Sequence, residues 1–205
     1  MIAPPLLVKP PRRVTPALLL SVWLGLLLFS TVAEAQETTA PGLPAEQTVG
    51  GQKLFLNGTA TRTVWGFEVY RIGLFLARPS HDEKAIIGTD RDAKRVHIIM
   101  LRGVSKDRFT GTVQESIDLN FTPEEKAKFA GELATFLGFF HEGTDLKSGS
   151  EVILDFVPGQ GMVALLDGTA VGTIPGDDFY HAILRLWIAT PLQKSIKDGL
   201  LGNVS

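Results

Sequence analysis

The stretch that most constrains the fold of this chain runs from Val152 to Trp187. Three short apolar runs alternate with turn signals in its first part. The second turn signal is Asp167-Gly168, and Asp-Gly between two apolar runs is typical of a type I′ hairpin, whose central residues both need a positive φ. The first is the Pro-Gly-Gln-Gly sequence at 158–161, which interrupts regular structure. The stretch therefore predicts an antiparallel meander with strands over Val152–Val157, Met162–Leu166 and Ala170–Ile174.

A helical pattern follows the meander and is predicted to cover Phe179–Ile188. Its large apolar residues recur at i, i+4, i+7 and i+8, which places them on one stripe that can lie across a sheet. Asp177 or Asp178 is expected to cap the first turn through its carboxylate. A meander that leads into a covering helix is typical of the α+β class.

The earlier part of the domain adds further strands and helices. Strands are predicted over 52–56 and 59–65, joined by a turn at Asn57-Gly58, and over Phe67–Leu76 and 95–101. The strand Phe67–Leu76 has apolar residues on both alternating faces, so both faces are expected to be covered in part. Helices are predicted over 106–119, over 123–138 behind a capping box at Thr122, and, shorter, over 81–87 and 192–201. This order predicts one antiparallel sheet with helices on one face.

The first 35 residues have the layout of a secretory signal peptide. Lys9, Arg12 and Arg13 precede an apolar run over 16–32, and Ala33-Glu34-Ala35 offers small residues at the cleavage positions. Cleavage is expected after Ala35, which predicts a periplasmic or secreted protein without a stable membrane span. An uncleaved membrane anchor remains the alternative, because the run approaches the lower length of a bilayer-spanning helix. Residues 36–48 are predicted to be a flexible leader, and 49–205 a single domain.

Composition excludes several classes of function. The chain has no cysteine and therefore no disulfide framework. Its formal net charge of −2, with no basic run after the leader, argues against a nucleic-acid partner. No two of the four histidines stand at metal-ligand spacing, and no dinucleotide or phosphate-binding motif is complete. No metal or cofactor is therefore expected, and the oligomeric state stays open.

Several pieces of the sequence, taken in their order, resemble the chalcone isomerase-like superfamily. They are LNGTATR, VYRIGLFL, RVHIIMLRGVS, VILDFVPGQG and GTIPGDDFYHAIL, and the likeness spans Val49 to Gly202. The chain is most similar to the secreted bacterial chalcone isomerase-like domain proteins. The resemblance implies an open-faced β-sandwich, in which a large antiparallel sheet is covered on one face by a layer of helices above a cleft. In this superfamily the plant enzymes cyclise chalcones to flavanones there, whereas other members bind fatty acids.

The resemblance also implies a set of cleft residues. Arg62 matches an arginine that the plant enzymes and the fatty-acid binders share, and its guanidinium suits either a carboxylate or a phenolate. From spacing alone, an exposed edge-strand arginine is the simpler interpretation. Tyr70 stands where the plant enzymes have a threonine, Phe109 where they have the catalytic tyrosine, and Ser116 where they have an asparagine. Leu186 replaces a further hydroxyl-bearing residue.

These departures remove most of the polar groups that would stabilise an enolate during cyclisation. One cation in an otherwise apolar cleft suits an apolar acid better than a polyphenol. The expected function is therefore an exported, non-catalytic binding protein for a fatty acid or a similar apolar anion, with no catalytic residue assigned. One alternative is an intramolecular lyase that cyclises a chalcone-like substrate. Another is an envelope interaction module whose cleft is filled by its own side chains.

Overall fold

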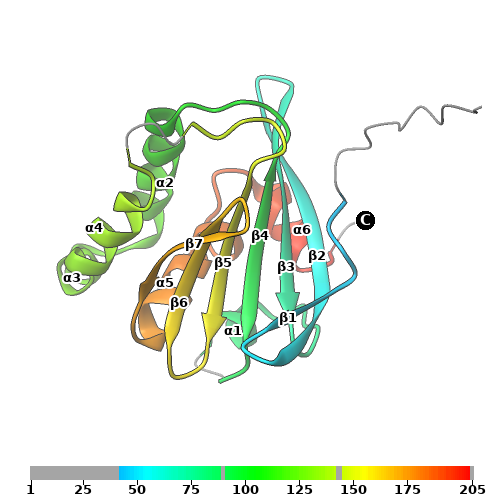
Figure 1. The fold of residues 1–205 in the computed structure, drawn as a ribbon, viewed down its shortest axis with the longest axis vertical. Coiled ribbons are helices and arrows are strands. Elements are labelled where there is room, and N and C mark those ends of the chain that lie inside the picture. Colours follow the sequence, from blue (N-terminus) through cyan, green and yellow to red (C-terminus); the bar gives the residue numbers. More distant parts are fainter. Residues whose placement is uncertain (1–41, 89–90, 142–144, 204–205) are drawn as a thin grey trace, which may run out of the picture. The chain divides into compact units, whose positions relative to one another are not determined.

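The computed structural model describes residues 42–88, 91–141 and 145–203. They form a seven-stranded antiparallel sheet in which every strand pairs with its neighbour in sequence (Figure 1). This confirms the predicted α+β class and the large antiparallel sheet. The strands are β1 Glu46–Val49, β2 Gln52–Val64, β3 Phe67–Leu76, β4 Lys94–Met100, β5 Glu151–Val157, β6 Gly161–Leu166 and β7 Thr169–Ile174.

The helices gather behind and beside this sheet in Figure 1, with α5 and α6 behind the strands and α2 to α4 as a separate group at one side. They are α1 Glu83–Ile87, α2 Lys106–Asn120, α3 Pro123–Lys128, α4 Ala130–Gly138, α5 Asp177–Ile188 and α6 Lys194–Leu200. Within the described ranges, none of them has the length and apolarity needed to cross a membrane. The apolar run over 16–32 lies outside the described residues.

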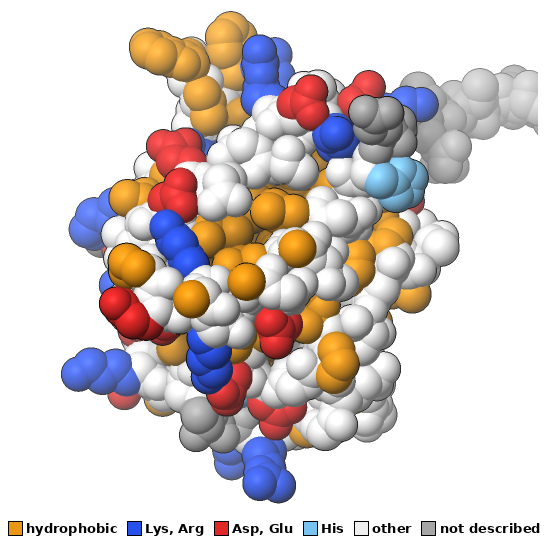
Figure 2. All heavy atoms as spheres, turned by 90° about the vertical axis from the view of Figure 1, so that its left-hand side faces the viewer, with side chains coloured by type: hydrophobic (Ala, Val, Ile, Leu, Met, Phe, Trp, Pro, Cys, Tyr) orange, Lys and Arg blue, Asp and Glu red, His pale blue; other side chains and the backbone are white. Residues whose placement is uncertain are grey.

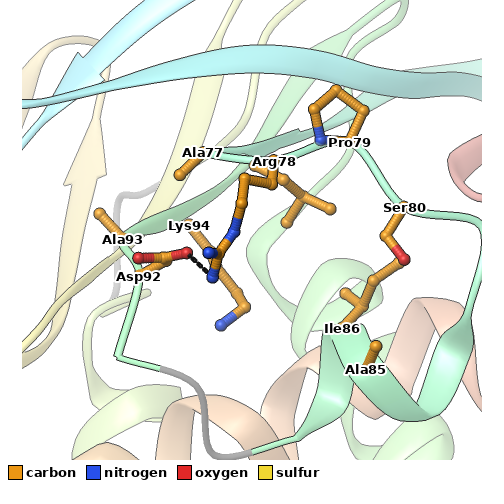
Figure 3. Close-up of a pocket in the computed structure, with 10 residues that line it drawn as sticks. Ala77, Arg78, Pro79, Ser80, Ala85, Ile86, Asp92, Ala93 and Lys94 are labelled. Atoms are coloured by element: carbon orange, nitrogen blue, oxygen red, sulfur yellow. Dashed lines mark ion pairs between the residues drawn. The ribbon is translucent and has the colours of Figure 1, made fainter.

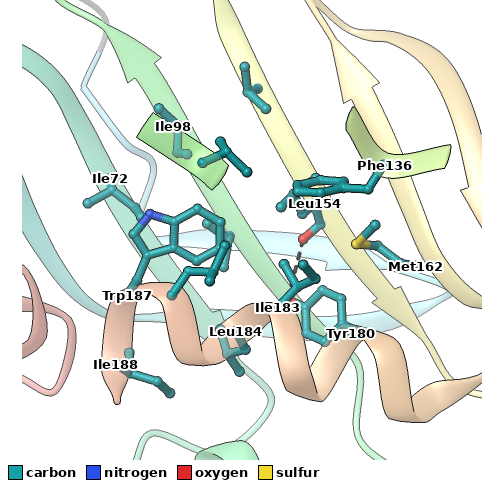
Figure 4. Packing of buried hydrophobic residues seen from close by; sticks show 14 of the residues in the cluster. Ile72, Ile98, Phe136, Leu154, Met162, Tyr180, Ile183, Leu184, Trp187 and Ile188 are labelled. Atoms are coloured by element: carbon teal, nitrogen blue, oxygen red, sulfur yellow. Dashed lines mark hydrogen bonds between the residues drawn. The ribbon is translucent and has the colours of Figure 1, made fainter. Parts of the chain in front are cut away.

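The main hydrophobic core lies between the sheet and α5. The predicted stripe of α5 is buried throughout, and Figure 4 shows Ile183 and Trp187 turned towards Ile72, Ile98 and Leu154 on the strands. Burying each such side chain stabilises the folded state by about 1.5–3 kcal/mol, so the packing of α5 against the sheet is a main source of stability for the fold. The hydroxyl of Tyr180 donates to the carbonyl oxygen of Leu154 at 3.4 Å, which satisfies a phenol that is otherwise surrounded by apolar groups.

A second, smaller core covers the outer face of the sheet. It consists of Val49, Leu54, Phe75 and Ala93, and it forms because β1 pairs with the start of β2 and also contacts β5. Phe75 belongs to this core, whereas its neighbours on β3 belong to the main one, so the expectation that both faces of Phe67–Leu76 are covered is confirmed. Because β1 includes residues 46–48, the sheet begins before the expected domain boundary at residue 49.

The predicted turn at Asn57-Gly58 is wrong, because β2 runs without interruption from Gln52 to Val64. The pair lies at a bulge in the register with β3. The Asn57 side chain donates to the carbonyl oxygens of Ser80 and Leu200 at 3.0 and 2.8 Å. A Cβ atom on Gly58 would lie 2.1 Å from the Gly199 carbonyl oxygen, so only glycine lets α6 approach β2 this closely.

Two predicted helix starts have different outcomes. The capping box at Thr122 is confirmed, since its hydroxyl accepts from the Glu125 N–H and the Glu125 carboxylate accepts from the Thr122 N–H. The expected cap at Asp177 or Asp178 is wrong, because α5 begins after Gly176, whose φ is 90°. Asp178 instead pairs with Lys128 at 2.9 Å, which ties α5 to α3.

Candidate functional site

A pocket lies between the end of the β2–β3 hairpin and helices α2 and α5. The five residues predicted from the sequence, Arg62, Tyr70, Phe109, Ser116 and Leu186, all line it. The other lining residues are Val64, Val69, Ile98, Met100, Val104, Thr112, Val113 and Trp187. The structure therefore brings together residues that come from β2, β3, β4, α2 and α5. Seen from the side of α2 to α4, apolar side chains are visible in hollows between polar and charged groups (Figure 2).

Arg62 reaches this pocket from β2, directly opposite Tyr70 on β3. Its guanidinium Nη1 donates to the side-chain oxygen of Gln193 at 3.2 Å. The same oxygen accepts from the Thr63 N–H at 2.9 Å, and Gln193 Nε2 donates to the Thr61 carbonyl oxygen at 3.1 Å. Arg62 is thus half-buried and held from the side of α6, and it is not the freely exposed edge-strand arginine of the simpler interpretation.

Tyr70 adds a hydroxyl group to the pocket and interacts electrostatically with the Arg62 charge. Desolvation raises the pKa of Tyr70 above its usual value, and the Trp187 side chain and the Arg62 charge counteract this only in part. The phenol therefore stays neutral at physiological pH and keeps a proton that it can donate to a bound anion.

The remaining wall is mostly apolar. Leu186 and Trp187 are 3% and 8% exposed and close the pocket from α5, while the Phe109 ring packs against the Phe140 ring at an interplanar angle of 54°, with the centroids 4.7 Å apart. Ser116 is buried on the face of α2 that turns towards the sheet. Among the lining residues, Arg62 is the one with a charged side chain. The arrangement can hold an anion at one point and an apolar group along the rest.

The pocket is small, with a volume of about 80 Å³. Pockets for drug-sized ligands have volumes of roughly 300–1,000 Å³. Helix α2, which forms one wall of the pocket, has three buried residues, Val113, Ser116 and Ile117, whereas α5 has nine. Both ends of α2 are held by polar contacts, which include two hydrogen bonds between Asn120 and Thr190.

Sequence reasoning missed Gln193 altogether and assigned Trp187 to the core stripe alone. Gln193 stands outside any motif, and 131 positions separate it from Arg62, so no local pattern points to it. Trp187 lies on the predicted stripe, and its position near the end of α5 explains why it both packs in the core and lines the pocket.

A second cavity, of about 210 Å³, lies where β3 and β4 meet α1 (Figure 3). Arg78 pairs there with Asp92 at 2.5 Å, and Lys94 lies over the Phe156 ring at 5.4 Å. None of the five predicted residues lines it. The described residues contain no cluster of histidines and carboxylates that could hold a metal ion.

The comparisons with known proteins agree with this architecture. The family model described as chalcone isomerase-like matches residues 35–202. Among solved structures, a fatty-acid binding protein of Arabidopsis thaliana matches with a TM-score of 0.58 and 17% identity, over 78% of this chain and 91% of that chain. No match was found among the curated proteins. At this identity the structural likeness shows the fold, and the family match spans most of the chain, which therefore belongs to the chalcone isomerase-like family.

Proposed function

We propose that this protein binds a fatty acid or a similar apolar acid in the pocket and does not convert it chemically. The observation that carries the proposal is the position of Arg62, the one charged group in a mostly apolar lining. The Arabidopsis thaliana protein of the same fold is a fatty-acid binding protein, which supports this choice of ligand.

The charge at Arg62 is arranged to receive a carboxylate. Gln193 takes one N–H group of the guanidinium, and the remaining ones can pair with both oxygens of a carboxylate. Tyr70 lines the same pocket, and its neutral hydroxyl can add a further hydrogen bond. An anion held in this way leaves its apolar part to Leu186, Trp187 and the strand residues Ile98 and Met100.

A long acyl chain needs more room than the pocket offers. We propose that α2 moves away from the sheet as the chain enters, because α2 contributes few buried side chains. Phe109 lies on this helix and Phe140 on the segment after α4, so the contact between their rings is broken as α2 moves.

The pocket lacks most of the polar groups that the lyase alternative requires. Phe109 and Leu186 offer only hydrocarbon at two positions where the resemblance implies hydroxyl-bearing residues. A developing enolate would meet Arg62 and Tyr70 alone, and removing one stabilising donor from such a site typically costs a factor of about 10²–10³ in rate.

The decisive experiment is a titration of a long-chain fatty acid against the wild type, Arg62→Ala and Arg62→Lys. Truncating one partner of a buried charge pair costs about 2–5 kcal/mol, which is at least a roughly thirty-fold loss of affinity for Arg62→Ala. Arg62→Lys should recover only part of it, because an ammonium cannot present a planar fork.

Arg71→Ala is the matched control, since Arg71 neighbours Tyr70 on β3 and does not line the pocket. Equal affinity in all variants would exclude Arg62 from the site. Chalcone turnover should be followed in parallel, and turnover well above the uncatalysed rate that is lost in Arg62→Ala would favour the lyase.

We also propose that the protein is exported and cleaved after Ala35, on the basis of its charged flank, apolar run and small residues at 33–35. Intact-mass measurement of protein recovered from the native envelope fraction should give a chain that starts at Gln36. Full-length protein recovered from the cytosol would contradict export.

A further inference from the structure

The tip of the β2–β3 hairpin exposes large aromatic side chains. Trp65 is 94% exposed and Phe67 is 58% exposed. The hairpin extends beyond the neighbouring strands at the top of Figure 1, and apolar side chains stand out from the surface at the top of Figure 2. The other strongly exposed large apolar side chains that the structure describes, Phe55, Leu119 and Val171, lie on other parts of the fold.

The backbone conformation at Trp65 is unfavourable for a tryptophan. Trp65 and Gly66 form the two-residue turn with φ values of 53° and 81°. The β6–β7 hairpin has the same geometry, with φ values of 48° and 76°, and uses Asp167-Gly168, the residue types that tolerate it. A bulky residue with a positive φ is an outlier. Because the indole is almost wholly exposed, no packing within the described residues offsets this strain.

The tip also carries a cation and adjoins the pocket. The Arg102 guanidinium lies over the Phe67 ring, 4.6 Å from its centroid. Val64 and Val69, on either side of the turn, line the pocket together with Arg62. Exposed aromatic side chains, one of them beside an arginine, are typical of residues that lie at the interface between water and a lipid bilayer.

We propose that this aromatic tip, formed by Trp65 and Phe67 with Arg102, docks on the surface of a lipid bilayer. The indole then lies among the lipid headgroups and upper acyl chains, and Arg102 contacts lipid phosphates. Docking brings the pocket close to the apolar phase, where an apolar ligand resides. The inference stands on the exposure and strain of the tip, and it does not depend on which ligand the pocket holds.

The small size of the tip favours a bilayer over a protein partner. Two aromatic side chains bury no more than about 500 Å² together. A stable protein interface buries about 800 Å² on each partner, and the residues that flank the tip, Thr63 and Glu68, are exposed and polar. A bilayer surface sets no such minimum area, because an aromatic residue can enter it singly.

The experiment measures whether lipid reaches Trp65 in the full chain. The experiment uses the uncleaved chain, in which Trp23→Phe removes the indole of the N-terminal apolar run and leaves Trp65 and the buried Trp187. The protein is then reconstituted with vesicles of equimolar phosphatidylcholine and phosphatidylglycerol, with bromine either high or low on the phosphatidylcholine acyl chains. We expect a blue shift of the Trp65 emission and stronger quenching by the shallow bromines. Both responses should be lost in Trp65→Phe.

The matched control distinguishes docking of the tip from mere tethering by the N-terminal run. Leu119→Trp, made together with Trp65→Phe, places an indole at another exposed apolar position, on α2. This indole should remain unquenched, and circular dichroism should show that every variant is folded. Equal quenching at position 119 would overturn the proposal. An unquenched Trp65 would also overturn the proposal. In that case, capture of a protein by a photo-crosslinker placed at position 65 would assign the tip to a protein partner.

Discussion

The side-chain amide of Gln193 joins Arg62 to its own strand, with its oxygen 3.2 Å from the Arg62 Nη1 and its nitrogen 3.1 Å from the Thr61 carbonyl oxygen. The segment before α6 thus sets the direction in which the guanidinium points. Gln193 is a positioning residue, because it does not line the pocket itself.

Gln193→Ala should weaken binding of a long-chain fatty acid by roughly five-fold, since a lost hydrogen bond of this kind costs about 1 kcal/mol. Gln193→Glu should weaken fatty-acid binding much more, because the new carboxylate would form an ion pair with Arg62 and compete with the ligand carboxylate. Urea unfolding should show that both variants are folded. Unchanged affinity in Gln193→Glu would contradict the placement of the ligand carboxylate at Arg62.

Filling the pocket from α2 should block binding without removing any polar contact to Arg62. Ser116→Leu adds an apolar side chain to the face of α2 that lines the pocket. Affinity for a long-chain acid should fall at least about ten-fold, and overpacking should lower the free energy of unfolding by about 1–3 kcal/mol. Glu115→Leu, the exposed neighbour on the same helix, should leave the affinity unchanged. Comparable losses in both variants would point to a general effect on α2.

Trp65→Asn should stabilise the protein. Asparagine tolerates a positive φ that costs a bulky residue about 1–2 kcal/mol, so the free energy of unfolding should rise by about 1 kcal/mol. Urea unfolding followed by circular dichroism measures this without relying on the removed indole. Gly66→Asn is the contrasting variant and should not stabilise, because glycine already tolerates its φ of 81°. A destabilised Trp65→Asn would mean that the tip packs within the fold.

The outer face of the sheet should make stability depend on pH. Burial lowers the pKa of His97 below 6.5, and the carboxylate of Glu151 offsets this only in part. The neutral ring suits its contacts, because Nδ1 can accept from Gln47 Nε2 at 3.1 Å while Nε2–H donates to Glu151 at 2.9 Å. The Gln47 side-chain oxygen accepts from Arg95, which fixes the direction of the amide.

Because the folded pKa lies below the unfolded one, the unfolded chain binds more protons as pH falls through 6.5. The His97 contribution to stability is therefore constant above this pH and decreases below it, by at most about 1.4 kcal/mol per pH unit. Urea unfolding from about pH 8 to about pH 5 checks this against His97→Gln, which cannot titrate. The same pH dependence in both proteins would assign it to other groups.

Much of the fold was predictable because its signals are local. The turn at Asp167-Gly168, the capping box at Thr122 and the stripe on α5 each depend on residues only a few positions apart. The same holds for Phe67–Leu76, where alternation alone indicates two covered faces. The five site residues came from a resemblance to a family, and the structure places them around one pocket, although their role in binding stays a prediction.

Asn57-Gly58 shows where local reasoning fails. The pair is a strong turn signal by itself, yet in the folded chain the Asn57 side chain bonds with backbone groups near Ser80 and Leu200, and Gly58 admits the backbone at Gly199. The actual turn falls at Trp65-Gly66, where the first residue is unfavourable for it. At Asn57-Gly58, contacts between distant segments outweighed the intrinsic turn preference of the pair.

The sequence by itself thus determined most of the elements, their order and the apolar faces that must meet, because burial and turn chemistry act over a few residues. It did not reveal strand β1 or the continuity of β2. Only the tertiary structure decided that Gln193 holds Arg62 across 131 positions, that the pocket is as small as about 80 Å³, and that Trp65 is left in solvent at a hairpin tip. These features depend on how closely the packed elements approach one another, and no periodicity along the chain records that distance.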